Sequence, residues 1–216
     1  MRNTLLLLSL VSFFSCLQDS NQTAIKNESK FSSLLTKYKD ISFDTLKVFS
    51  SDNTELDTYK FKGVQLDSVD VLLFPESIAN LNGPGEVFAA CFKFFLDSSR
   101  IALLTRVPST YQSSSLQLFI FDRNSDSITN IIELAEMVAD AGYLYIKNSW
   151  VYKTIKGETQ IFAWIQESHD NSVENEYDTT IDVTNNYYLL SILKNRVDTI
   201  NQSKEVLTKR FESLLK

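Results

Sequence analysis

Short runs of apolar residues, each followed by polar residues, recur along most of the chain at a length typical of β-strands. Turn-forming residues separate many of these runs, most clearly Asn-Gly-Pro-Gly at residues 82–85. The pattern therefore indicates a mainly β protein. Strands are predicted at residues 43–49, 55–64, 86–96, 100–107, 116–122, 127–130, 143–146, 150–155, 159–166, 187–193 and 196–200.

Three other stretches have apolar residues at helical spacing. One covers residues 28–39. A second covers residues 131–139, where Asn130 and Glu133 match a capping box. A third begins near Ser203 and runs to the end of the chain. A polar loop is predicted between the last two long strands, up to about residue 185.

Residues 86–140 and 141–201 resemble each other as four-stranded antiparallel meanders, of the kind found in propeller blades. Two blades do not close a propeller, which takes at least four. The expected fold is therefore two meanders packed as a sandwich or open barrel, with short flanking helices at both ends. Residues 28–216 form this single domain. The repeat is short and gapped, so a repeat without structural meaning is the alternative.

Composition excludes several classes of function. The net charge of −6 argues against binding of nucleic acid, which requires clustered Lys and Arg. Five glycines and the absence of a G-x-G-x-x-G or P-loop pattern argue against a nucleotide site. We therefore expect no nucleic acid, no nucleotide and no cofactor.

The N-terminus has the order of a signal peptide. Arg2 precedes an apolar segment at residues 5–14, which is too short for a membrane-spanning helix of roughly 20 residues. Residues 1–15 are therefore predicted to be a signal peptide. Residues 16–27 are polar and are predicted to form a flexible tether.

Ser15 and Cys16 directly after the apolar segment resemble the lipobox of bacterial lipoproteins. Phe13 and Phe14 depart from that motif, which has an aliphatic and a small residue at these positions. The resemblance implies that Cys16 carries acyl chains such as palmitate. It also implies a membrane-anchored protein on the periplasmic or cell-surface side. The alternative is an ordinary secretory signal and a secreted protein.

Few residues suggest catalytic or metal chemistry. Cys91 lies in an apolar strand-like run, which indicates a buried, inert thiol. His169 is the only histidine, and its acidic neighbours in the chain do not make a triad, whose members converge from separate elements. We interpret it as a solvated loop histidine. One histidine and two cysteines do not favour a zinc site, so no metal and no catalytic residue is predicted.

The predicted polar loop is strongly acidic, because residues 157–193 contain no Lys or Arg. Unpaired like charge steers a partner of opposite charge, so this loop is a candidate docking surface for a basic protein. A calcium site and a merely solvated insertion are the alternatives, although the EF-hand order is absent. The candidate residues are Glu167, Asp170, Glu174, Glu176, Asp178 and Asp182.

These observations favour a membrane-tethered, non-enzymatic module that binds a protein or another ligand, for example an inhibitor of the immunity type. One alternative is a hydrolase that works with two carboxylates across a cleft. Another is a carbohydrate-binding module of the cell envelope. Its sugar platform would come from the aromatic pairs Trp150 with Tyr152 and Phe162 with Trp164, although such stripes usually belong to a core.

Overall fold

The computed structural model describes residues 29–51, 53–83, 85–109, 114–194 and 196–216. The predicted signal peptide, the tether and Cys16 lie outside the described residues. In the part of the chain that is described, no helix has the length and apolar character needed to cross a membrane.

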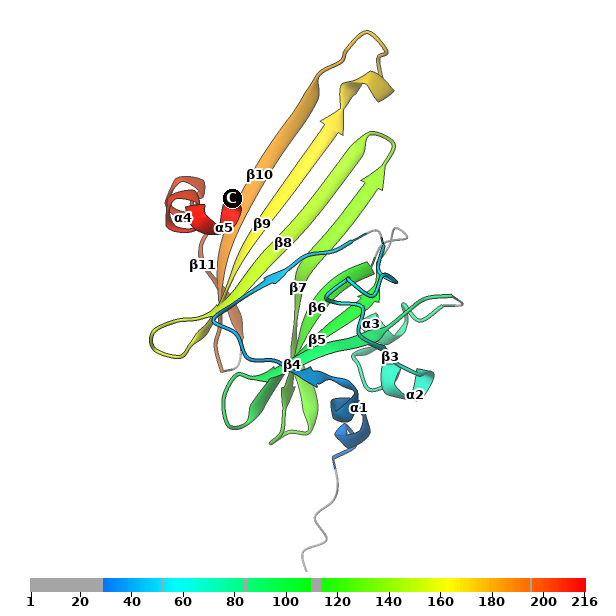
Figure 1. Ribbon diagram of the computed structural model, residues 1–216, viewed down its shortest axis with the longest axis vertical. Coiled ribbons are helices and arrows are strands. Elements are labelled where there is room, and N and C mark those ends of the chain that lie inside the picture. The colour runs from blue at the N-terminus through cyan, green and yellow to red at the C-terminus, as the bar shows by residue number, and fades with distance from the viewer. Residues whose placement is uncertain (1–28, 52, 84, 110–113, 195) are drawn as a thin grey trace, which may run out of the picture.

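The described chain contains long strands and short helices (Figure 1). The strands are β1 (Lys39–Asp40), β2 (Thr45–Val48), β3 (Val64–Gln65), β4 (Ala89–Phe95), β5 (Arg100–Pro108), β6 (Ser114–Asp122), β7 (Ser127–Asp140), β8 (Tyr143–Lys153), β9 (Thr159–Asp170), β10 (Ile181–Ile192) and β11 (Val197–Asn201). The helices are α1 (Ser32–Lys37), α2 (Ser68–Val71), α3 (Glu76–Ala79), the 3₁₀ turn η1 (Asn171–Val173), α4 (Lys204–Arg210) and α5 (Glu212–Leu215).

One 11-stranded sheet contains all these strands, in the order β1-β4-β5-β6-β7-β8-β9-β10-β11. Beside this path, β2 pairs with β8 and β3 pairs with β4. The pairings are antiparallel except for that of β1 with β4. The sheet is not closed into a barrel. The prediction of a mainly β fold built from antiparallel meanders is therefore confirmed, whereas the domain boundaries and the half-repeat stay predictions.

The long strand β7 connects the two halves of this sheet. Its residues 127–135 pair with β6, and its residues 136–140 pair with β8. Leu134 and Ala135 are both buried where the strand passes from one half to the other. The alternation of buried and exposed side chains is lost there, so the apolar residues of the sequence have the spacing of a helix. The helix predicted over residues 131–139 is wrong.

The main core lies between the two halves of the sheet. Apolar side chains of β4, β5 and β6 pack in one cluster with side chains of β2, β7, β8, β9 and β10. Leu104 and Leu118 from one half and Val151 and Ile161 from the other are fully buried in it. This packing makes the lower part of the molecule in Figure 1 an unclosed sandwich.

Short helices cover the outer faces of the sandwich. At one end of the chain, α1, α2 and α3 pack against β5 and β6, with Phe74 and Phe119 in edge-to-face contact. At the other end, the chain from α4 to α5 packs on β8, β9 and β10, where Phe162 and Phe211 stack with ring centroids 4.2 Å apart. The helix predicted to begin near Ser203 is present, and Ser203 is the N-cap of α4. The short flanking helices at both ends are therefore confirmed.

Several element boundaries differ from the sequence predictions. In the predicted strand over residues 55–64, residues 55–63 are turns and irregular backbone, and only the start of β3 lies at its end. The two strands predicted at 143–146 and 150–155 are one strand, β8. The predicted polar loop before residue 185 is shorter than expected, because β9 continues to Asp170 and β10 begins at Ile181.

Candidate functional site

Two hairpins extend beyond the sandwich and form a projecting part of the sheet, which we call the arm. The arm consists of residues 136–148 and 165–188, from β7, β8, β9 and β10. Figure 1 shows its tip at the opposite end of the molecule from α1. The β7–β8 turn has positive φ at Ala141 and Gly142, as the tight turns of twisted hairpins require.

Strand register assigns the arm residues to two faces. Tyr145, Glu167 and Thr184 are cross-strand neighbours and share one face, which continues the side of the inter-sheet core. Gln166 and Asn185 share the other face, which continues the side that α4 and α5 cover. Because the arm extends past both cores, most of its side chains are only partly buried.

The six acidic candidates all lie on the β9–β10 hairpin of the arm, but only three of them lie in its loop. Two are on β9, one is on β10, and the others form the tip between the strands. The structure thus places half of these residues on strands and not in the predicted polar loop. In chain order they are Glu167, Asp170, Glu174, Glu176, Asp178 and Asp182.

Three of these acids also shape the tip. Asp170 accepts a hydrogen bond from the Ser172 backbone N–H at 3.0 Å, and Asp178 accepts one from the Thr180 N–H at 3.0 Å. Asp182 accepts one from the Asn171 side chain at 3.2 Å. Hydrogen bonds from Ser172 and Thr180 lower the pKa of Asp170 and Asp178, so both carboxylates stay ionised at neutral pH.

His169 lies on β9, so its predicted position in a loop is wrong. It pairs with Tyr143 on one side and with Asp182 on the other. Its side chain is 36% exposed, and Nε2 lies 3.5 Å from a carboxylate oxygen of Glu174. The histidine therefore belongs to the acidic surface of the arm.

A carboxylate cluster that the sequence analysis missed lies where the arm meets the sandwich. Lys147 donates a hydrogen bond to Glu133 at 2.9 Å, and Ser109 donates one to Glu136 at 2.7 Å. Partial burial, together with the charge and a hydrogen bond of Glu133, raises the pKa of Glu136. The sequence pattern predicts a capping box at Glu133 and does not show that Ser109, which follows β5, and Lys147 of β8 contact the two glutamates of β7.

A neighbouring carboxylate disfavours the ionised form of a carboxyl group, in agreement with the raised pKa of Glu136. Within the described residues, no group of three or more His, Cys, Asp and Glu side chains is placed to hold a metal ion.

Cys91 and the aromatic stripe belong to the interior. Cys91 is 4% exposed, its thiol donates to the Phe61 carbonyl at 3.2 Å, and burial raises its pKa to about 12. Trp150 and Phe162 are buried beneath the C-terminal helices, and Tyr152 and Trp164 pack against them. These rings therefore form a core rather than an open platform.

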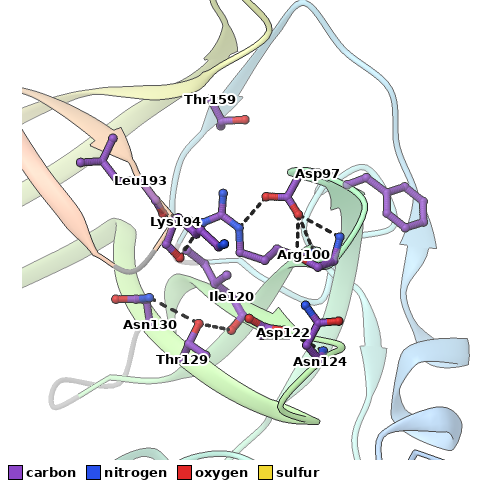
Figure 2. A network of polar contacts seen from close by, with 12 residues as sticks. Asp97, Arg100, Ile120, Asp122, Asn124, Thr129, Asn130, Thr159, Leu193 and Lys194 are labelled. Atoms are coloured by element: carbon purple, nitrogen blue, oxygen red, sulfur yellow. Dashed lines mark hydrogen bonds and ion pairs between the residues drawn. The ribbon is translucent and has the colours of Figure 1, made fainter.

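A polar network at the base of the sandwich joins its two halves (Figure 2). Arg100 of β5 is buried and donates to the carbonyls of Leu193 and Lys194 in the β10–β11 turn, the latter at 3.2 Å. Its Nε also donates to Asp97 at 2.7 Å. A shallow groove of about 220 Å³ lies beside Asp97 and Arg100. Because the guanidinium is engaged by these partners, we assign the network a structural role.

Another groove, of about 250 Å³, lies at the side of the arm. Asn185, Asn186, Tyr187 and Tyr188 of β10 line it, together with Gln202 and Lys204 from the chain after β11. Consecutive residues of a strand point to opposite faces. A groove that touches all four must therefore lie along the edge of β10 and not over one face.

Comparison with known proteins finds no matching family model, no matching curated protein and no matching solved structure.

Proposed function

We propose that the protein is a membrane-tethered, non-enzymatic interaction module that binds a basic protein partner through the acidic surface of its arm. The observation that carries the proposal is the position of the arm tip, opposite α1 (Figure 1). Helix α1 is the first helix after the predicted tether. An arm that points away from the anchored end presents its acids to a partner in the surrounding space.

Charge supports the same function. Residues 157–193 contain acidic residues and no Lys or Arg, so their charge is not balanced within this part of the chain. Such a surface raises the association rate of a basic partner and loses that effect as salt screens it over about 8–10 Å. We expect capture of the partner to weaken steeply as the salt concentration rises.

Anchoring through acylated Cys16 is the second part of the proposal. It would hold the arm on the periplasmic or cell-surface side of a bacterial membrane, as an inhibitor of the immunity type requires. Mass spectrometry of the mature N-terminus tests it. A diacylated Cys16 at residue one supports anchoring, and an unmodified N-terminus beyond Cys16 contradicts it.

The acidic surface is tested by neutralising the tip and measuring partner capture from membrane extracts. The variant Glu174→Gln, Glu176→Gln, Asp178→Asn and Asp182→Asn keeps side-chain acceptors for the hydrogen bonds of the tip. A matched control removes four exposed charges elsewhere, by Glu76→Gln, Glu86→Gln, Glu205→Gln and Glu212→Gln. We expect only the tip variant to lose the partner. Equal capture by the tip variant and the wild type would contradict the proposal.

A further inference from the structure

The part of β10 that belongs to the arm has a neighbouring strand on one side only. Residues 181–188 pair with β9, whereas β11 pairs with β10 only at residues 189–192. Among the described residues, no strand pairs with the other side of residues 181–188. An edge of this length is a template for pairing with another chain.

Apart from the charge of Asp182, this edge lacks the features that usually block such pairing. Edge strands are protected by Lys, Pro, bulges or short length. Residues 181–188 contain no Lys, Arg, Pro or Gly, and their register with β9 has no bulge. Ile181 and Val183 are 62% and 52% exposed. By contrast, β1 and β3 at the other end of the sheet are two residues long.

The groove of about 250 Å³ lies along this same edge, where β11 ends and α4 begins. A strand added to residues 181–188 would continue the line of β11, and its end would lie in the groove. Charge differs along the edge. Asp182 and the acidic tip lie at one end, and Lys204 lines the groove at the other.

We infer that residues 181–188 of β10 bind an extended segment of a partner protein as an added β-strand, with basic residues of that segment at the acidic tip. The inference rests on the proposed function, which supplies the basic partner. Backbone hydrogen bonds to β10 provide affinity, and the acidic tip selects for a basic end. The acidic tip alone would bind any basic segment, whereas the β10 edge binds only a segment whose backbone is extended.

A second copy of the chain fits this edge less well. Antiparallel pairing of two β10 edges would point the two arms in opposite directions, and the α1 ends with them. Two chains anchored in one membrane by their N-termini do not adopt that arrangement. Parallel pairing would place the two acidic tips side by side, where like charges repel.

Synthetic peptides test the inference directly, on the chain from residue 16 with Cys16→Ser. The probe is a peptide of alternating Thr and Val that ends in three Lys. One control peptide ends in Glu instead, and another has N-methyl groups on alternate backbone nitrogens. The measurements are peptide affinity and hydrogen exchange of the amides in residues 181–188 that point away from β9. We expect the probe to bind and to slow exchange at these amides, and both control peptides to fail.

A matched pair of variants locates the site. Val183→Lys places a protective lysine on the edge and should weaken the probe about tenfold. Val64→Lys makes the same change at a site of similar exposure, 55%, at the far end of the sheet, and should bind the probe as the wild type does. Equal loss in both variants, or no loss in either, would overturn the inference.

The remaining outcomes separate the inference from the proposed function. If the free protein already protects the amides of residues 181–188 that point away from β9, another part of the chain or a second copy occupies the edge, and the inference is wrong. If Val183→Lys captures the cellular partner normally while the tip variant does not, strand addition is wrong and the proposed function stands. If the tip variant captures the partner normally, the proposed function is contradicted.

Discussion

The indole N–H of Trp164 donates a hydrogen bond to the side-chain oxygen of Asn185, 2.8 Å away on the neighbouring strand. The pair joins β9 to β10 at the base of the arm, and Asn185 lines the groove beside the β10 edge. It holds the last part of the edge strand in register before β11 begins. The register of the β10 edge therefore depends on this hydrogen bond between neighbouring strands.

Removing the acceptor should loosen this junction. Asn185→Ala leaves the partly buried indole N–H without its partner, and we expect a loss of about 1 kcal/mol in the free energy of unfolding. Urea unfolding measures it. Asn186→Ala, on the opposite face of the same strand, is the control and should cost less. Equal losses would show that the hydrogen bond does not stabilise the arm.

Arg100 should contribute more to stability than any exposed arginine, because it links β5 to the β10–β11 turn. Arg100→Met removes its hydrogen bonds to the Lys194 carbonyl and to Asp97, and we expect a loss of about 2 kcal/mol. Arg196→Met is the control, since its side chain is 72% exposed, and should change stability by less than about 0.5 kcal/mol. Equal urea midpoints for the two variants would contradict the structural role.

Asp97 should make the sandwich sensitive to acid. Partial burial acts to raise its pKa, but hydrogen bonds from Arg100 and Ser99 hold the pKa of this carboxyl well below its usual range. A folded-state pKa below the unfolded value stabilises the fold above about pH 4 and loses that effect as the pH falls further. Asp97→Asn should therefore flatten the acid side of the Tm profile. Asp44→Asn, an exposed control, should leave the profile unchanged.

Glu136 should have the opposite pH dependence, because its pKa is raised by partial burial and by Glu133. The folded protein then binds more protons than the unfolded chain between the usual and the raised pKa, so stability falls as the pH rises through that interval. Glu136→Gln should raise Tm at neutral pH, and the difference should vanish below about pH 4. Glu86→Gln is the exposed control. A lower Tm for Glu136→Gln at neutral pH would contradict the assignment.

The strands of the sandwich were predictable because their side chains are buried in continuous apolar runs. The runs that became β4, β5 and β6 stand out in the sequence, and so does the apolar stripe of the C-terminal helix that begins near Ser203. Strand β7 was missed where it crosses between the halves, because burial of both Leu134 and Ala135 breaks the alternation that marks a strand.

The arm was only partly predictable for a different reason. The parts of β9 and β10 that belong to the arm lie beyond both cores, so neither of their faces needs to be apolar. Their polar sequence therefore resembles that of a loop. Charge alone located the six acids. The contacts of Glu133 with Lys147 and of Glu136 with Ser109 join residues 14 and 27 positions apart, and they depend on strand register that no local pattern encodes.

Site-specific photo-crosslinking in intact membranes tests the central claim most directly. A photoreactive residue replaces Tyr177 at the arm tip, which is 86% exposed, or Ile155 in the β8–β9 turn, which is fully exposed. We predict a discrete protein adduct from position 177 that is absent from position 155, and that the four-residue tip variant loses. Identical adduct patterns from both positions, or no adduct from position 177, would contradict the assignment of the arm as the partner-binding surface.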